Sequence, residues 1–168
     1  GNNNAYCQDN EISWIDWNDL KKNVEIFDFF KSIIQLRKNH PVLRYESEFE
    51  FNNACNGYPS LSFHGKKAWQ VDYESDKPCL AVMFCGSNLK GDQDEMVYSA
   101  LNMHWEMHGF ELPKLPFNFK WYIAVNTDMN GMEDIWADND EKYLDNQEEI
   151  LVSPRSVVIL IAKQNRCE

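Results

Sequence analysis

Two uninterrupted apolar stretches, LAVMFC at residues 80–85 and VVILI at residues 157–161, decide the fold of this chain. Each is short, and a short apolar run bounded by turn residues is typical of a strand buried within a sheet. Further runs rich in β-branched and aromatic residues recur between clusters of Gly, Asn, Asp and Pro. No strand-helix-strand rhythm is present. The sequence therefore predicts a mainly β fold, an antiparallel β-sandwich, and not a parallel sheet or a complete barrel.

The remaining strands are expected on both sides of these stretches. Within residues 120–126, Trp121, Ile123 and Val125 alternate with Lys120, Tyr122 and Ala124, which predicts one buried face. The predicted strands cover residues 48–51, 61–63, 80–85, 95–102, 120–126 and 156–163, with weaker candidates at 109–112 and 149–152.

A helix is predicted over residues 24–38, with Asn18 or Asn23 as its N-cap and His40-Pro41 as its end. Its polar residues fall on one stripe, and apolar residues take more than half of its circumference. One sandwich covers only part of so wide a face. We therefore expect the isolated chain to expose an apolar patch here or to cover it by self-association.

Residues 1–17, GNNNAYCQDNEISWIDW, combine a loop-forming start with paired tryptophans. Gly and Asn readily adopt turn conformations, so residues 1–4 predict irregular structure. Amide and aromatic side chains suit sugar hydroxyls and the apolar faces of pyranose rings. A binding loop and a solvated chain end are both compatible with this composition.

Composition limits the classes of function. The 168 residues fit one domain of ordinary size, and 43% hydrophobic residues exclude wholesale disorder. A net charge of −11, with 16 Lys and Arg among 27 acids, argues against nucleic-acid or anionic-membrane partners. No signal peptide or transmembrane run is recognisable, and the five cysteines show no close pairing, so we expect a cytoplasmic setting with Cys79 and Cys85 as small buried thiols.

No metal or cofactor is predicted. The acidic segment 126–144 begins like a calcium loop, but Ala137 stands where the bidentate Glu belongs, and the role of this segment stays open. His104, Glu106 and His108 alternate without the His-Glu-x-x-His spacing, which favours surface or turn histidines over a zinc site. His64 is expected to be structural. No phosphate loop, serine elbow or cysteine-histidine signature is found.

Residues 1–17 resemble the segment after the last barrel strand in glycogen debranching enzymes of the isoamylase type, in the α-amylase superfamily. Weaker similarities follow in the family's order, and they are LRKNHPVL at 36–43, SFHG at 62–65, LNMHW at 101–105 and SPRSV at 153–157. The resemblance implies a remnant of the (β/α)8 barrel at residues 1–44 and an α-amylase-type C-terminal sandwich at 45–168.

The resemblance also implies a function. The intact enzyme would hydrolyse α-1,6 branch linkages in glycogen or related glucans, with its catalytic carboxylates on the barrel, upstream of Gly1. No acid of this chain is assigned a catalytic role, so the chain alone is expected to be inactive. Its helix would pack on the barrel, mainly through Phe29, Phe30, Ile33 and Leu36. Substrate contacts in the intact enzyme are expected from Asn4, Tyr6, Gln8, Asn10 and Trp14, unless these side chains only brace the loop.

Two alternatives remain open. A carbohydrate-binding module would present exposed aromatic rings as a platform for glucan, with Trp69, Tyr73, Trp105 and Trp136 as candidates. Most of these rings lie beside apolar runs, where packing in the core is the default. A scaffold unrelated to glucans would require the similarity over residues 1–17 to be accidental.

Overall fold

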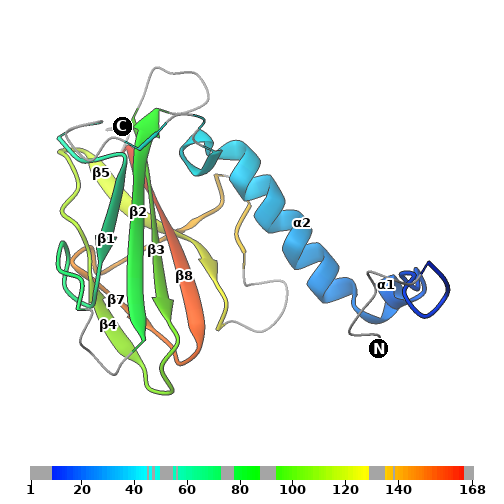
Figure 1. The fold of residues 1–168 in the computed structure, drawn as a ribbon. Coiled ribbons are helices and arrows are strands. Elements are labelled where there is room, and N and C mark those ends of the chain that lie inside the picture. Colours follow the sequence, from blue (N-terminus) through cyan, green and yellow to red (C-terminus); the bar gives the residue numbers. More distant parts are fainter. Residues whose placement is uncertain are drawn as a thin grey trace.

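The computed structural model describes residues 9–44, 46, 48–49, 55, 57–72, 78–87, 94–128, 135–137 and 139–164. Two helices and a short 3-10 turn come first, and they are α1 (Asp19–Lys22), α2 (Val24–Asn39) and η2 (Pro41–Arg44). The strands follow as β1 (Leu61–His64), β2 (Cys79–Ser87), β3 (Asp94–Asn102), β4 (His108–Glu111), β5 (Phe119–Asn126), β6 (Lys142–Tyr143), β7 (Glu149–Val152) and β8 (Ser156–Gln164). Figure 1 shows the strands packed together and α2 running away from them. The predicted fold class, an antiparallel β fold preceded by a loop and a helix, is confirmed.

The strands form a six-stranded sheet in the order β1-β2-β3-β8-β5-β6 and a two-stranded sheet of β4 and β7. Every pairing is antiparallel. The two apolar stretches occupy β2 and β8, and each of these strands has a neighbour on both sides. Because interior strands satisfy their backbone groups on both edges, continuous apolar sequence suits them. The expectation that these stretches are internal is confirmed.

The main core lies between the large sheet and the small one. It joins Ala81, Met83 and Cys85 of β2 to Tyr98 of β3, and it includes Phe110 of β4 together with side chains of β5, β7 and β8. The opposite face of the large sheet carries a second, smaller cluster, which is formed by Leu36, Val42, Val97, Ala124, Val125 and Ile161. Helix α2 and η2 thus cover only part of the outer face, and Leu80 of β2 stays 36% exposed.

Strand β5 departs from the expected alternation. Trp121 faces the main core, whereas Ala124 and Val125 both belong to the second cluster. The register with β8 shifts between Ile123 and Val125. The shift turns Val125 away from the side of Trp121 and Ile123, where strict alternation places it, and Ala124 is buried because the second cluster covers the outer face.

Other sequence predictions are confirmed or corrected along the chain. The weak strand candidates became β4 and β7, and the helix prediction matches α2. Glu48 and Phe49 lie outside any strand, and residues 50–51 of that candidate lie outside the described residues. The two-residue strand β6 was not predicted. Asn18 and Asn23 precede α1 and α2, but neither side chain makes a capping hydrogen bond, since the Asn23 amide instead donates to the Asp19 carbonyl.

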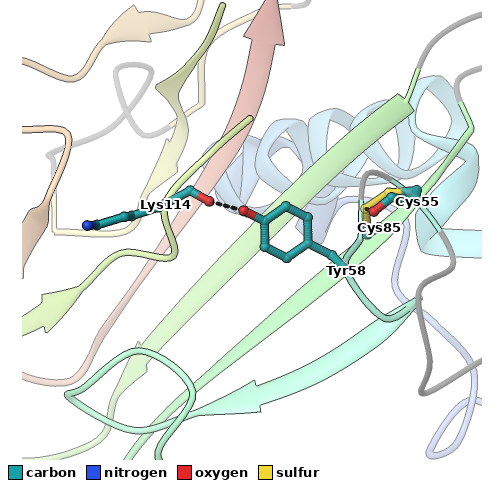
Figure 2. Close-up of a disulfide and its surroundings, with 4 residues drawn as sticks. All are labelled: Cys55, Tyr58, Cys85 and Lys114. Carbon is teal, nitrogen blue, oxygen red and sulfur yellow. Dashed lines mark hydrogen bonds between the residues drawn. A yellow bond between two sulfur atoms is a disulfide. The ribbon is translucent and has the colours of Figure 1, made fainter. Parts of the chain in front are cut away.

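Cys55 and Cys85 form a disulfide across 30 positions of sequence. Figure 2 shows it beside Tyr58, whose hydroxyl donates to the Lys114 carbonyl. The expectation of a thiol at Cys85 is therefore wrong, while Cys79 keeps its thiol, which lies 3.5 Å from the Asn102 Oδ1. Disulfides persist mainly in oxidising compartments, so this bond does not favour the reducing setting expected from sequence.

Candidate functional site

Helix α2 carries an exposed apolar face, which is the most unusual surface of the described residues. Large apolar side chains remain half or more exposed on it, as they do on the turn before α1. On the helix they are Ile26 at 58%, Phe27 at 50%, Phe30 at 60% and Ile34 at 53%, and before it Trp14 at 63%, Ile15 at 75% and Trp17 at 78%. We name this surface, Trp14 to Ile34, the N-terminal apolar face. Because monomers rarely expose large contiguous apolar patches, this face is the candidate contact surface of the described residues. The predicted exposure of the helix is confirmed.

Only the last turns of α2 pack on the sandwich. Leu36 is buried in the second cluster, and Ile33 packs partly against it. Beyond the helix, His40 Nδ1 contacts the Glu95 carboxylate, and both side chains are at least nine-tenths buried. The helix is thus fixed at its C-terminal end, and its N-terminal part extends away from the sheet (Figure 1). Of the four side chains expected to carry the barrel contact, Leu36 and Ile33 instead pack mainly on the sandwich side.

Two of the five expected substrate-binding residues lie in the described part of the chain. Asn10 closes a turn, because its Oδ1 accepts from the Ile12 backbone N–H at 3.1 Å and its carbonyl accepts from Trp14 at 3.0 Å. The Trp14 indole N–H donates to Asp9 Oδ1 at 2.9 Å, which leaves the ring face exposed. Asn4, Tyr6 and Gln8 lie outside the described residues.

The candidate glucan platform is scattered over the molecule. Trp105 is 70% exposed and stacks on His104 with 4.0 Å between ring centroids. Trp69 is 46% exposed and stacks nearly parallel on Tyr58. Trp136 is half-buried, and Tyr73 lies outside the described residues. Trp105 is the best placed of these rings for contact with a ligand.

The buried carboxylates of the described residues are held in ion pairs. Glu95 contacts His40, and Glu141 contacts Lys163. Glycoside hydrolysis needs two carboxyl groups on one scissile bond, about 5 Å apart in a retaining enzyme. A buried carboxylate that is committed to a basic partner is poorly suited to either role. Among the described residues no helix is both long and apolar enough to cross a membrane.

Two histidines differ in surroundings. His64 is fully buried, as expected of a structural residue, and burial lowers its pKa to about 4. His104 is also buried, at 3% exposure, so of the two settings expected for it, surface or turn, only the turn between β3 and β4 applies. Its neighbours Glu106 and His108 bring their ligand atoms close to its ring, with all three within 4.8 Å of one another.

Sequence comparison finds clear relatives, although no family model matches the chain. Glycogen operon protein GlgX homologs of Mycobacterium tuberculosis and Mycobacterium bovis are 50% identical over 140 residues, which are 76% of this chain and 19% of those proteins. A glycogen debranching enzyme of Pectobacterium carotovorum is 47% identical over 86 residues, 51% of this chain and 12% of that protein. The chain thus spans about a fifth of the length of the first relatives.

Solved structures share the fold. A pullulanase from Bacillus acidopullulyticus superimposes with a TM-score of 0.56 at 20% identity, over 96% of this chain and 16% of that one. A Group B Streptococcus pullulanase gives a TM-score of 0.54 at 13% identity, over 89% of this chain and 18% of that one. These TM-scores establish a common fold, whereas the evolutionary relationship rests on the sequence relatives named above. By sequence, the chain therefore corresponds to one region of the proteins named glycogen operon protein GlgX and glycogen debranching enzyme.

Proposed function

We propose that this chain is the C-terminal portion of an enzyme that hydrolyses α-1,6-glucosidic branch linkages in glycogen or related glucans. Residues 1–44 then belong to the end of a catalytic (β/α)8 barrel and residues 45–168 to a C-terminal sandwich. The portion itself is non-catalytic, and it stabilises the barrel by packing against it. The relatives named glycogen debranching enzyme support the substrate class.

The N-terminal apolar face is the observation that carries this proposal. Its Phe27 and Phe30 are 50% and 60% exposed, while Leu36 at the other end of the helix is buried against the sheet. A helix with one end on the sandwich and apolar side chains on its remaining surface fits between two domains. Contacts between domains of one chain bury roughly 600–1,500 Å². Burial of this face accounts for its composition.

The catalytic carboxylates, under this proposal, come from the barrel. The ion-paired state of Glu95 and Glu141 supports a structural part for this chain. Asn4, Tyr6, Gln8, Asn10 and Trp14 would contact substrate only in the intact enzyme. Of Asn10 and Trp14, the two that the structure describes, Trp14 is the better placed to stack on a glucose unit. Its ring is exposed, and its indole N–H is held by the hydrogen bond to Asp9.

Two measurements test the proposal. The reading frame upstream of Gly1 is expected to encode a barrel, and a start codon at or next to Gly1 would refute the assignment to a longer enzyme. The purified chain, incubated with branched glucan, is expected to release no reducing ends. Steady release of reducing ends by the purified chain would assign the chemistry to this chain instead.

The N-terminal apolar face also predicts self-association of the isolated chain. Replacing Ile26 and Phe30 together by Glu places two charges on this face and should shift a concentration-dependent oligomer toward monomer in sedimentation velocity. Both positions are exposed, so the thermal midpoint should change little. Glu substituted for Lys31, an exposed polar position on the same helix, serves as the control. A wild-type chain that remains monomeric at millimolar concentration would contradict the prediction.

A second candidate function is glucan binding by the sandwich itself. The exposure of Trp105 and its stacking on the buried His104 ring favour it, because a rigidly held indole is a good surface for a pyranose ring. Titration of the chain with maltoheptaose decides the question. Saturable heat that is lost in Trp105→Ala supports binding, and no heat at millimolar ligand excludes it.

A further inference from the structure

The connection between β3 and β4 holds one histidine rigidly. The His104 backbone N–H donates to Asn102 Oδ1 at 3.0 Å, and its carbonyl accepts from the Arg155 N–H at 3.0 Å. The side chain is only 4% exposed, and Trp105 covers one face of its ring. The imidazole therefore has a fixed position between the end of β3 and the turn that precedes β8.

Two further ligand-bearing side chains meet this imidazole. His108 Nε2 lies 3.1 Å from His104 Nδ1, and Glu106 Oε2 lies 3.7 Å from the same nitrogen. Ligands of a tetrahedral zinc ion at about 2.0–2.1 Å stand roughly 3.3 Å apart from one another. These two separations bracket this value, and all three ligand atoms lie within 4.8 Å of one another. We propose that His104, Glu106 and His108 bind one divalent transition-metal ion, with the chemistry of Zn²⁺.

The protonation state of His104 suits this role. Its Nδ1 accepts the Glu106 backbone N–H at 3.1 Å, so this nitrogen carries a lone pair and the proton sits on Nε2. A bound metal takes that lone pair in place of the present hydrogen bonds. His108 Nε2 faces an acceptor and therefore donates in the metal-free state, so it must move its proton to Nδ1 to bind the metal.

The ligand set selects the kind of ion. Two imidazoles and one carboxylate suit Zn²⁺, Cu²⁺ or Ni²⁺, whereas Ca²⁺ and Mg²⁺ prefer oxygen ligands alone. Three protein ligands leave one position for water, and the Glu106 side chain is 59% exposed, so solvent reaches the site. The metal would link His104 and Glu106, in the connection between β3 and β4, to His108, the first residue of β4.

The site is remote from the N-terminal apolar face. His104 lies two residues after the end of β3, whereas Glu95, which contacts His40 just after α2, lies next to the first residue of β3. Figure 1 shows the β3–β4 turn at the opposite end of the sheet from the point where α2 joins it. Loss of metal binding and loss of barrel docking can therefore be measured separately.

Calorimetric titration with zinc chloride tests the proposal on the full 168-residue chain, stripped with chelator and with its thiols alkylated so that cysteines supply no ligand. We expect one saturable Zn²⁺ per chain and no comparable heat from magnesium chloride. At one hundred times the dissociation constant, the thermal midpoint should rise by roughly 5–10 °C. Glu106→Gln and His108→Gln, which leave the buried His104 intact, should each weaken binding by about tenfold or more.

Glu111→Gln is the matched control, because Glu111 is an exposed carboxylate on β4 outside the three-residue cluster. It should bind Zn²⁺ as the wild type does. Circular dichroism of every variant checks that the sheet is retained. Absence of saturable Zn²⁺ binding, or equal affinity in the wild type and both ligand variants, would overturn the proposal.

Discussion

Replacing Asn102 by Leu is expected to lower the free energy of unfolding by roughly 3–5 kcal/mol, the largest loss we foresee for a single substitution. The side chain is fully buried at the end of β3. Its Nδ2 lies 2.8 Å from the Glu106 carbonyl oxygen and 3.0 Å from those of Val152 and Ser153. Its Oδ1 accepts the His104 N–H. Leucine has a similar size but leaves these backbone groups without their partner, and the two buried ones, the Val152 carbonyl and the His104 N–H, cost about 1–3 kcal/mol each.

Urea unfolding, followed by tryptophan fluorescence, measures this loss. Asn126→Leu is a matched control, because Asn126 ends β5 as Asn102 ends β3, while among the described residues its Oδ1 accepts an exposed Asp128 N–H at 3.2 Å. The control should cost less than about 1 kcal/mol. Equal losses of unfolding free energy in the two variants would show that the Asn102 hydrogen bonds stabilise the fold no more than the Asn126 hydrogen bond does. Asn102→Leu should also weaken any Zn²⁺ binding, since it releases the backbone of His104.

Acidification from pH 7 to pH 4 is expected to remove about 3 kcal/mol of stability through His64. The Trp69 N–H donates to His64 Nδ1 at 2.8 Å, and Ser62 Oγ lies 2.9 Å from Nε2. Burial lowers the pKa from 6.5 to about 4. The folded state therefore binds this proton less readily than the unfolded chain. The stabilisation is complete above pH 6.5 and is lost as the pH falls through 6.5 toward 4.

His64→Gln isolates this contribution. Glutamine does not titrate, so the variant should be less stable than the wild type at pH 7 but should lose less stability on acidification to pH 4.5. Carboxyl groups titrate in both proteins, and their effects cancel in the comparison. Denaturant unfolding at half-unit intervals of pH gives the two slopes. Parallel slopes would mean that His64 does not account for the acid sensitivity.

Local sequence was sufficient to predict most of the sheet. The stretches LAVMFC and VVILI are interior strands because their apolar side chains can be buried on both faces, and turn residues mark their ends. The short strands β4 and β7 were harder to recognise, since each has only four residues. Strand β6 consists of Lys142 and Tyr143 and depends on its pairing with β5, which no local pattern reveals.

Long-range geometry explains what the sequence concealed. Cys55 and Cys85 are 30 positions apart, and only the return of the chain along β2 brings their Cα atoms within 6.1 Å. The burial of His104 depends on Asn102 and on Arg155, which lies 51 positions later. The His-x-Glu-x-His alternation was visible in the sequence, but nothing local indicated that the first imidazole would be enclosed.

The existence of the N-terminal apolar face was predictable from the sequence, but the neighbour of each of its side chains was not. The width of the apolar stripe on α2 indicated two neighbours, and the exposed Phe27 and Phe30 agree with it. The assignment of individual side chains to each neighbour could not be made, because it depends on the angle at which α2 leaves η2. Leu36 and Ile33 pack against the sheet, next to the contact between His40 and Glu95 at the end of the helix.

The outermost strands of the large sheet bear on how this chain can aggregate. β1 has four residues and β6 only two, so neither offers a long row of unpaired backbone groups to a second molecule. Short edges of this kind oppose the strand-to-strand stacking that leads to amyloid. Aggregation during expression should therefore be reversible. Detergent, or a partner that covers the N-terminal apolar face, should reverse it more readily than denaturant.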